Sequence, residues 1–172
     1  MAKEIELRRH TDADGDVLSA EGVEAALAIG ARLTGNYHLA VSTGAQRATQ
    51  TLACFLAALA EEVPGGVIVE TGLRSDVEDR WRSAYQSAGS GELQALREAD
   101  PVLVAEDSGR LGAALRRVLD QLPDGGRALV VGHSPTNEAA ILGLTGEIVK
   151  PLGKGDGVLV VADDGYSVRP LD

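Results

Sequence analysis

The sequence contains one cysteine, few aromatic residues and no long apolar run. A single thiol, Cys54, cannot form an internal disulfide, and its place within an apolar helical pattern is typical of a small core residue. Aromatic residues make up only 3% of the chain, so the core must be mainly aliphatic. The first ten residues, MAKEIELRRH, have no apolar signal core, and no stretch reaches the length of a membrane span. We therefore expect a cytoplasmic protein with no membrane partner.

Positive charge is also scarce. There are 16 Lys and Arg residues against 26 Asp and Glu, which gives a formal net charge of -10 at pH 7. Nucleic acids and anionic lipids are attracted by a positive field, so the composition argues against both as partners. A small anionic substrate is still compatible with this charge, because a site can be locally positive on an acidic protein.

The remaining composition is that of an ordinary globular chain. Hydrophobic residues account for 44% and charged residues for 24% of 172 positions, a length that can bury a full core. We expect a single domain over residues 1–172. The oligomeric state cannot be predicted from this sequence.

Strand-like and helical patterns alternate along most of the chain. Strands are predicted over 4–10, 38–42, 67–69 and 128–132, followed by a hairpin with strands over 158–161 and 166–168. Helices are predicted from about Ser19, Ala45 and Pro135, and over 111–122. Between 71 and 101 the pattern weakens, and we expect a mobile, partly helical excursion. The alternation predicts a three-layer α/β/α sandwich with a mainly parallel sheet and an antiparallel edge.

Two helix starts allow more detailed predictions. Ser19 is a good N-cap for a helix whose apolar stripe would pack on the sheet. That stripe consists of Val23, Ala26, Leu27, Gly30 and Leu33. Ser134 is expected to cap the later helix, with Pro135 at its first position.

Cationic side chains and histidines follow three of the predicted strands. Arg9 and His10 end the first strand, Arg47 lies in the first turn of the helix after the second, and His133 follows the strand 128–132. The carboxyl ends of parallel strands meet at one edge, where ligands bind in open α/β sheets. Two helix N-termini at the same edge would also favour an anion. The sequence therefore predicts a phosphate-binding pocket.

Four segments resemble motifs of the histidine phosphatase superfamily, the branch that includes the cofactor-dependent phosphoglycerate mutases. They are RRHTDAD at 8–14, LSAEGVEAA at 18–26, STGAQRATQT at 42–51 and VVGHSP at 130–135. Their order and spacing match that superfamily over most of the chain. The resemblance implies a phosphoglycerate mutase-like fold and the chemistry of phosphoryl transfer.

The resemblance also implies roles for individual residues. His10 would be the nucleophile that forms a phosphohistidine, with its other ring nitrogen donating to a fixed acceptor such as a backbone carbonyl. Arg9, Arg47 and His133 would hold the phosphoryl oxygens as charge builds in the transition state, and Thr11 and Ser134 are further phosphate-binding candidates. No metal or cofactor is implied, because these motifs contain no carboxylate cluster for magnesium.

The chain departs from the superfamily pattern at three positions. Thr11 replaces the usual glycine after the histidine, and Asp16 stands where many members have an asparagine near the phosphate. Ser75 occupies the place of the usual glutamate proton donor. Asp76 and Glu78 are neighbouring acids that could serve instead, and Glu78 is preferred for its reach.

The missing acid and the short excursion resemble the small bacterial phosphohistidine phosphatases. We expect a phosphatase that acts on a phosphomonoester or on phosphohistidine, with a small phosphorylated metabolite or a phosphoprotein as partner. A degenerate binder of a phosphorylated ligand is the alternative, and a mutase-type phosphotransferase is the third. Specificity is expected to lie between Leu73 and Asp100, where four side chains could line an entrance. These are Arg74, Arg80, Trp81 and Arg82.

Overall fold

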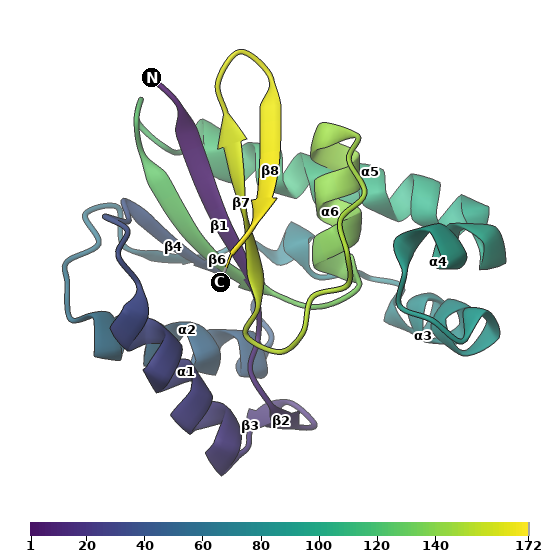
Figure 1. Cartoon of the computed structure of the whole chain (residues 1–172), viewed down its shortest axis with the longest axis horizontal. Helices are drawn as coiled ribbons and strands as arrows, with labels where there is room; N and C mark the ends of the chain where they lie inside the picture. Colours follow the sequence, from purple (N-terminus) through teal and green to yellow (C-terminus); the bar gives the residue numbers. More distant parts are fainter. Residues whose placement is uncertain (172) are drawn as a thin grey trace.

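The computed structural model describes residues 1–171 and contains one six-stranded mixed sheet in the order β5-β4-β6-β1-β7-β8. The strands are β1 (Lys3–Arg9), β4 (Leu39–Ser42), β5 (Val67–Val69), β6 (Arg127–Gly132), β7 (Gly157–Ala162) and β8 (Tyr166–Pro170). β1, β4, β5 and β6 are parallel, whereas β7 and β8 form an antiparallel edge (Figure 1). The predicted mainly parallel sheet with an antiparallel edge is confirmed.

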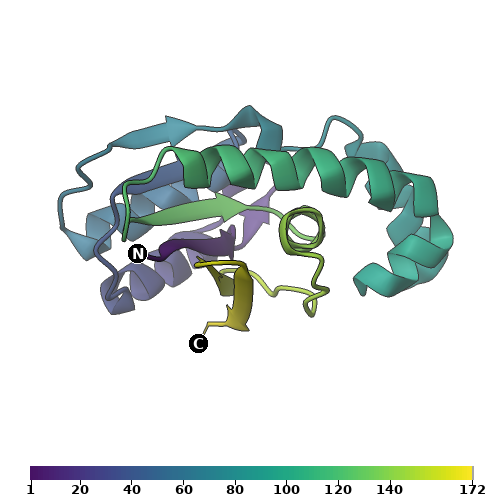
Figure 2. The same ribbon diagram turned by 90° about the horizontal axis from the view of Figure 1, so that it is seen from above.

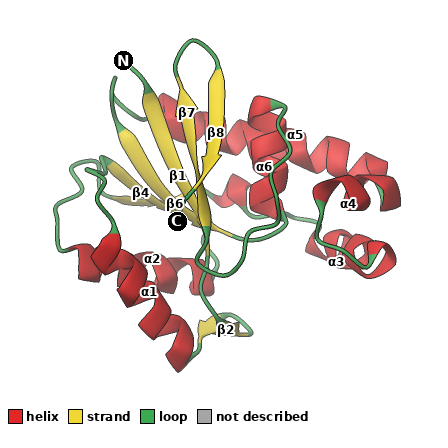
Figure 3. Ribbon diagram, viewed as in Figure 1, coloured by secondary structure: helices red, strands yellow, loops and turns green. Residues whose placement is uncertain are grey.

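Helices cover both faces of the sheet and complete three layers (Figures 2 and 3). α1 (Ala20–Arg32) and α2 (Gln46–Leu59) lie on one side, and α5 (Pro101–Asp120) and α6 (Thr136–Thr145) lie on the other. Alternate residues of β6 enter different cores: Leu129 and Val131 pack with α2, whereas Val130 packs with α5 and α6. Because both faces are buried, β6 appears in the sequence as an uninterrupted apolar run.

The first helix packs differently from the prediction. Ser19 does cap α1, because its side chain accepts a hydrogen bond from the Gly22 N–H at 3.0 Å. However, α1 packs mainly on α2 rather than on the sheet, and Val23 and Leu27 are 37% and 40% exposed. The packed face is made of small residues instead. A Cβ at Gly30 would lie 2.6 Å from the Phe55 carbonyl oxygen, so only glycine allows this close approach of the two helices.

The segment between β5 and β6 is more regular than predicted. It contains a 3-10 turn, η1 (Thr71–Leu73), and two helices, α3 (Glu78–Ala88) and α4 (Leu93–Ala99), before a longer α5 than expected. Figure 2 shows α3 and α4 at the far end of α5, beyond the strands. The buried Asp107 carboxylate of α5 anchors the start of this segment and α3 by accepting hydrogen bonds from Ser75 Oγ at 2.7 Å and Trp81 Nε1 at 2.6 Å.

Two local features near the strand ends were not predicted correctly. α6 begins at Thr136, Pro135 occupies the N-cap position, and Ser134 makes no capping hydrogen bond. Its hydroxyl instead donates to Glu138 Oε2 at 2.5 Å. A short hairpin, β2 (Ala13–Asp14) with β3 (Val17–Leu18), follows β1, and its tip is formed by Gly15, with φ of 64°, and Asp16.

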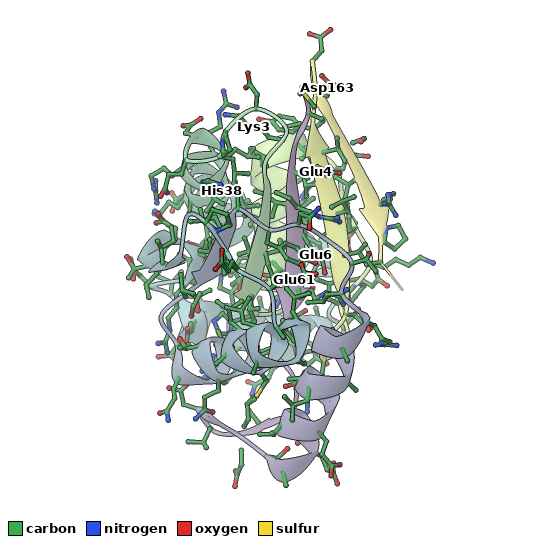
Figure 4. The ribbon with its side chains drawn as sticks, turned by 90° about the vertical axis from the view of Figure 1, so that its left-hand side faces the viewer. Lys3, Glu4, Glu6, His38, Glu61 and Asp163 are labelled. Atoms are coloured by element: carbon green, nitrogen blue, oxygen red, sulfur yellow. The ribbon has the colours of Figure 1, made fainter. Side chains whose placement is uncertain are left out.

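The two ends of the sheet differ in what they carry. Figure 4 labels Lys3, His38 and Asp163, which lie at the end where β1 begins, opposite to the end that carries His10. His38 is half-buried there, and its backbone N–H donates to the Arg127 carbonyl at 2.8 Å. Within residues 1–171, no helix combines the length and the apolar character needed to cross a bilayer.

Candidate active site

The ends of β1 and β6 place two histidines side by side. In the parallel pairing of these strands Arg9 is opposite Gly132, and the His10 backbone N–H donates to the Gly132 carbonyl at 3.0 Å. The next residue on β6 is His133, and the two imidazole ring centroids are 5.4 Å apart with an interplanar angle of 59°. The pairing of the strands therefore fixes the spacing of the two rings.

One ring nitrogen of His10 is committed to the backbone. His10 Nδ1 lies 2.7 Å from the Thr11 carbonyl oxygen, and because a carbonyl can only accept, Nδ1 carries the proton. Nε2 is then the unprotonated nitrogen of the neutral ring. Burial lowers the pKa of His10, with further lowering by the nearby charges of Arg47, Arg9 and Lys154, while the Thr11 carbonyl opposes these effects. The neutral form of His10 therefore persists to a lower pH than in an ordinary histidine.

His133 is more deeply buried, at 8% exposure, and is held by two contacts. Its Nε2 lies 2.8 Å from Thr43 Oγ1, and its backbone N–H donates to Asn137 Oδ1 at 3.2 Å. The Asn137 amide also donates to the Arg8 carbonyl at 3.1 Å, so one side chain joins the ends of β1 and β6. Burial, followed by the Arg47 charge, lowers the pKa of His133 to about 3. Without an anion beside it, His133 is a neutral hydrogen-bonding group.

Arg9 lies beside the histidines with part of its guanidinium occupied. Its Nη1 donates to the Leu152 carbonyl at 2.9 Å, whereas its buried Nε has no partner among the described residues. The neighbouring Arg8 is structural, since its Nε pairs with the buried Glu6 carboxylate at 2.6 Å. Of the two arginines in the RRH motif, Arg8 is therefore committed to an internal ion pair, whereas Arg9 keeps a buried donor without a partner among the described residues.

Arg47 and the N-terminus of α2 already hold an anion that belongs to the protein. The Asp16 carboxylate accepts from the backbone N–H groups of Gln46 and Arg47, both at 3.2 Å, and from Arg47 Nη1 at 2.8 Å. Burial acts to raise the pKa of Asp16, but the hydrogen bonds from Arg47 and Gln46 outweigh it, and the net pKa is lowered. Asp16 therefore occupies the donors at which the sequence predicts phosphate, and its side chain is 46% exposed at the hairpin tip.

The two other predicted phosphate contacts have structural partners. Thr11 is 1% exposed, its hydroxyl donates to the Gly22 carbonyl at 2.8 Å, and its N–H donates to Thr51 Oγ1 at 3.2 Å. It has no positive φ, so the usual glycine is not required here. Ser134 is half-buried and bonded to Glu138, whose pKa is raised to about 6, mainly by burial.

Two hollows lie between the strand ends and α3. The small hollow, of about 320 Å³, includes Arg47 and His133 among its lining residues, and the large hollow, of about 640 Å³, includes Thr43 and Asp76. Glu78 lines both, and its carboxylate pairs with Arg74 Nε at 2.9 Å. Asp76 lines only the large hollow.

The four residues expected to line an entrance are divided between the two hollows. Arg74 and Arg80 line the large one, and Trp81 and Arg82 line the small one. Within the described part of the chain, no group of three or more His, Cys, Asp or Glu side chains could hold a metal ion.

Sequence reasoning missed three residues that shape the site. Thr43 follows β4 within the STGAQR motif, so its position at a strand end was a usable signal for a contact with His133. Asn137 and Lys154 carried no such signal, because their roles depend on how distant segments meet. Lys154 forms an ion pair with Asp12, and its charge contributes to the lowered pKa of His10.

Solved structures with this arrangement of elements include phosphatases and a mutase. A phosphoglycerate mutase from Bacillus anthracis is 22% identical, with 99% of this chain and 92% of that chain covered at a TM-score of 0.72. The chain has the phosphoglycerate mutase-like fold. The fold predicted from the four motifs is thus confirmed.

Two phosphatases share the phosphoglycerate mutase-like fold with this chain. A phosphoserine phosphatase from Entamoeba histolytica, in complex with 3-phosphoglyceric acid, is 17% identical, with coverages of 98% and 94% and a TM-score of 0.70. A mycobacterial glucosyl-3-phosphoglycerate phosphatase with inorganic phosphate is 16% identical, with coverages of 98% and 95% and a TM-score of 0.69. No family model and no curated relative matches the sequence.

Proposed function

We propose that the protein is a phosphatase that hydrolyses a phosphomonoester or phosphohistidine through a covalent phosphohistidine at His10. The observation that carries this proposal is the Nδ1 contact with the Thr11 carbonyl at 2.7 Å, which leaves Nε2 unprotonated beside three cations. A small phosphorylated metabolite or a phosphoprotein would be the partner. The likeness to phosphatases and a mutase of the same fold supports phosphoryl transfer in general.

The reaction would proceed in two displacements at phosphorus. His10 Nε2 attacks, the P–N bond forms, and the bond from phosphorus to the leaving group breaks with its electron pair on the leaving atom. Water then attacks the phosphohistidine, the P–N bond breaks, and inorganic phosphate leaves with His10 restored to neutrality. Both steps develop charge on the equatorial oxygens, so preorganised donors around them provide most of the catalysis.

Three side chains would bind those oxygens. Arg47 offers its guanidinium from the first turn of α2, and Arg9 offers its unpartnered Nε. His133 would donate one N–H, and the approach of a dianion would raise its pKa. Ser134 would help to shape the wall of the small hollow. Thr11 is left out of the proposed oxygen contacts because its hydroxyl and amide are already bonded within the fold.

The leaving group would take its proton from Glu78. Glu78 lines the hollow that contains Arg47 and His133, whereas Asp76 lines only the other hollow. The Arg74 guanidinium, 2.9 Å from the Glu78 carboxylate, would limit its swing toward the site. A phosphoramidate or an acidic ester needs less proton donation than an alkyl ester, so such substrates would depend least on Glu78.

A binder without turnover is the second candidate, and two observations favour it. Asp16 fills the predicted phosphate donors on α2, and Ser75, at the expected acid position, is bonded to Asp107. A protein of this kind would hold a phosphorylated ligand only after Asp16 gives way. It would form no phosphoenzyme.

Rapid-quench labelling separates the two candidates. The protein would be mixed with ³²P-labelled substrate in excess chelator, and acid-labile, base-stable phosphoprotein would be measured alongside p-nitrophenyl phosphate hydrolysis. We expect turnover without added metal, and loss of label and turnover in His10→Ala but not in the remote control His38→Ala. Full activity in His10→Ala, or activity that requires a divalent metal, would contradict the mechanism. Binding without label would favour the second candidate.

A further inference from the structure

The small hollow has an apolar wall next to the proposed phosphate-binding groups. Trp81 and Tyr85 of α3 line it together with Pro135, and His133 and Arg47 line the same cavity. With a volume of about 320 Å³ it lies at the lower end of the range for small-molecule pockets. A phosphoryl group bound by His133 and Arg47 would therefore have its substituent beside these rings.

The two aromatic side chains differ in how firmly they are held. The Trp81 indole is 3% exposed and its Nε1 donates to Asp107 at 2.6 Å, so only a small part of the ring is accessible. The Tyr85 ring lies against Gly91, where a Cβ would be 3.4 Å from Tyr85 Cε2. Since Tyr85 is 52% exposed, a bound group would cover apolar surface that is now in water.

The large hollow is lined by side chains of a different kind. Charged and polar side chains dominate its lining, with Arg74, Asp76 and Glu78 among them, and neither Arg47 nor His133 belongs to it. A sugar or a polyanionic substituent would suit that cavity. The apolar wall beside Arg47 and His133 instead favours a flat, uncharged substituent directly attached to the phosphoryl group.

We propose that the small hollow binds a planar ring directly bonded to the phosphoryl group, so that the preferred substrates are ring phosphates rather than alkyl phosphates. This inference rests on the proposed function, because it takes the phosphoryl position from Arg47 and His133. Imidazole in phosphohistidine and phenol in an aryl phosphate share this chemistry. Flat rings gain from offset or edge-to-face contacts with aromatic side chains beyond the area that they bury.

The binding test uses three phosphonates that cannot be hydrolysed. Calorimetry would compare phenylphosphonate, cyclohexylphosphonate and methylphosphonate on the wild-type protein. We expect phenylphosphonate to bind about tenfold more tightly than methylphosphonate, and about two- to tenfold more tightly than cyclohexylphosphonate. Equal affinities, or a preference for cyclohexylphosphonate, would overturn the proposal.

Two substitutions of Tyr85 test the role of the apolar wall of the small hollow. Tyr85→Ala should reduce the phenyl-to-methyl affinity ratio about two- to tenfold, with methylphosphonate affinity unchanged, and Tyr85→Phe should keep the wild-type ratio. The half-exposed position makes misfolding easy to exclude by thermal unfolding. An unchanged ratio in Tyr85→Ala would also overturn the proposal.

Turnover measurements then distinguish this inference from the proposed function. Phosphoimidazole, phenyl phosphate and glycerol 2-phosphate would be compared on the wild-type protein and on Tyr85→Ala. Because phenol and imidazole are better leaving groups than an alcohol, the ring site is supported by a ring-to-glycerol ratio of kcat/KM that falls in Tyr85→Ala. Hydrolysis of glycerol 2-phosphate through His10 with no ring preference would refute the ring site and keep the phosphatase. Selective binding of phenylphosphonate without turnover of any substrate would support the ring site and refute the phosphatase. No binding of any phosphonate would refute both.

Discussion

Replacing Asp16 by Asn should strengthen the binding of inorganic phosphate. The Asp16 carboxylate lies 2.8 Å from Arg47 Nη1 and accepts two backbone N–H groups of α2, so it competes for the donors that phosphate would use. Asn keeps the side-chain carbonyl that can accept from the helix terminus but removes the negative charge. The Arg47 guanidinium is then left without an internal counter-ion.

The expected gain in phosphate affinity can be worked out from the exposure of the Asp16 side chain. An ion pair at a solvent-exposed site is worth about 0.2–1 kcal/mol, and Asp16 is 46% exposed. Repulsion between the carboxylate and an entering anion at about 4 Å adds roughly 1 kcal/mol per unit charge in water. For a singly charged phosphate these terms sum to about 1.2–2 kcal/mol, which predicts about 8- to 30-fold tighter binding in Asp16→Asn, since about 1.4 kcal/mol corresponds to a factor of ten.

The assay is calorimetric titration with phosphate at low and high salt. Asp14→Asn is the matched control, because it removes the same charge from the same hairpin while the Asp14 side chain forms no ion pair among residues 1–171. The gain in phosphate affinity of Asp16→Asn over wild type should become smaller at high salt, because salt screens the electrostatic interaction. It should persist from pH 5 to 8, because the pKa of Asp16 is lowered and the carboxylate is ionised throughout. Equal gains in both variants, or no gain in Asp16→Asn, would refute the reasoning.

Three further predictions concern the imidazoles and the α3 anchor. Thr43→Val should lower kcat/KM roughly tenfold in steady-state kinetics, because the His133 ring loses the hydroxyl that holds it. Thr43→Ser should restore the wild-type value, and a near-wild-type kcat/KM in Thr43→Val would contradict this role. His133 has a native pKa of about 3, so below pH 6.5 the unfolded chain takes up a proton that the native state excludes, and stability should fall by up to about 1.4 kcal/mol per pH unit. Urea unfolding between pH 6.5 and 4 should show a shallower decline for His133→Asn, and parallel declines would contradict the assignment. Asp107→Ala should lower the unfolding free energy by about 3 kcal/mol, because Trp81 and Ser75 lose their buried acceptor, whereas a loss under 1 kcal/mol would show that water replaces it.

The strand ends, and the functional residues at them, could be predicted from the sequence. Arg9 and His10 could be located because they end a predicted strand, and Arg47 and His133 because they come shortly after one. Parallel strands bring such ends together. The carbonyl acceptor for His10 Nδ1 was also expected, and the structure supplies it at Thr11.

The parts that were missed depend on contacts between distant segments. Nothing local indicated that Asp107 would anchor α3, because the two partners of its carboxylate lie 32 and 26 residues away. The face of α1 was assigned from large apolar residues, yet Gly30 allows a closer approach to α2 and turns Val23 and Leu27 outward. The effect of Asp16 depended on a hairpin too short to leave a periodic pattern.

The position of α3 and α4 beyond the strands has a consequence for how the substrate preference of this protein could be changed. The histidines directly follow β1 and β6, whereas the two aromatic side chains of the proposed ring-binding wall belong to α3, in a segment that contacts η1 and α5 and is bonded to one buried carboxylate. A replacement segment would have to keep the buried apolar contacts that Trp81, Leu93 and Leu96 make with the core. Grafting a foreign excursion between Leu73 and Pro101 is therefore a direct route to redirect substrate choice: the proposed nucleophile and phosphate-binding side chains stay in place, whereas the proposed proton donor Glu78 is exchanged with the segment.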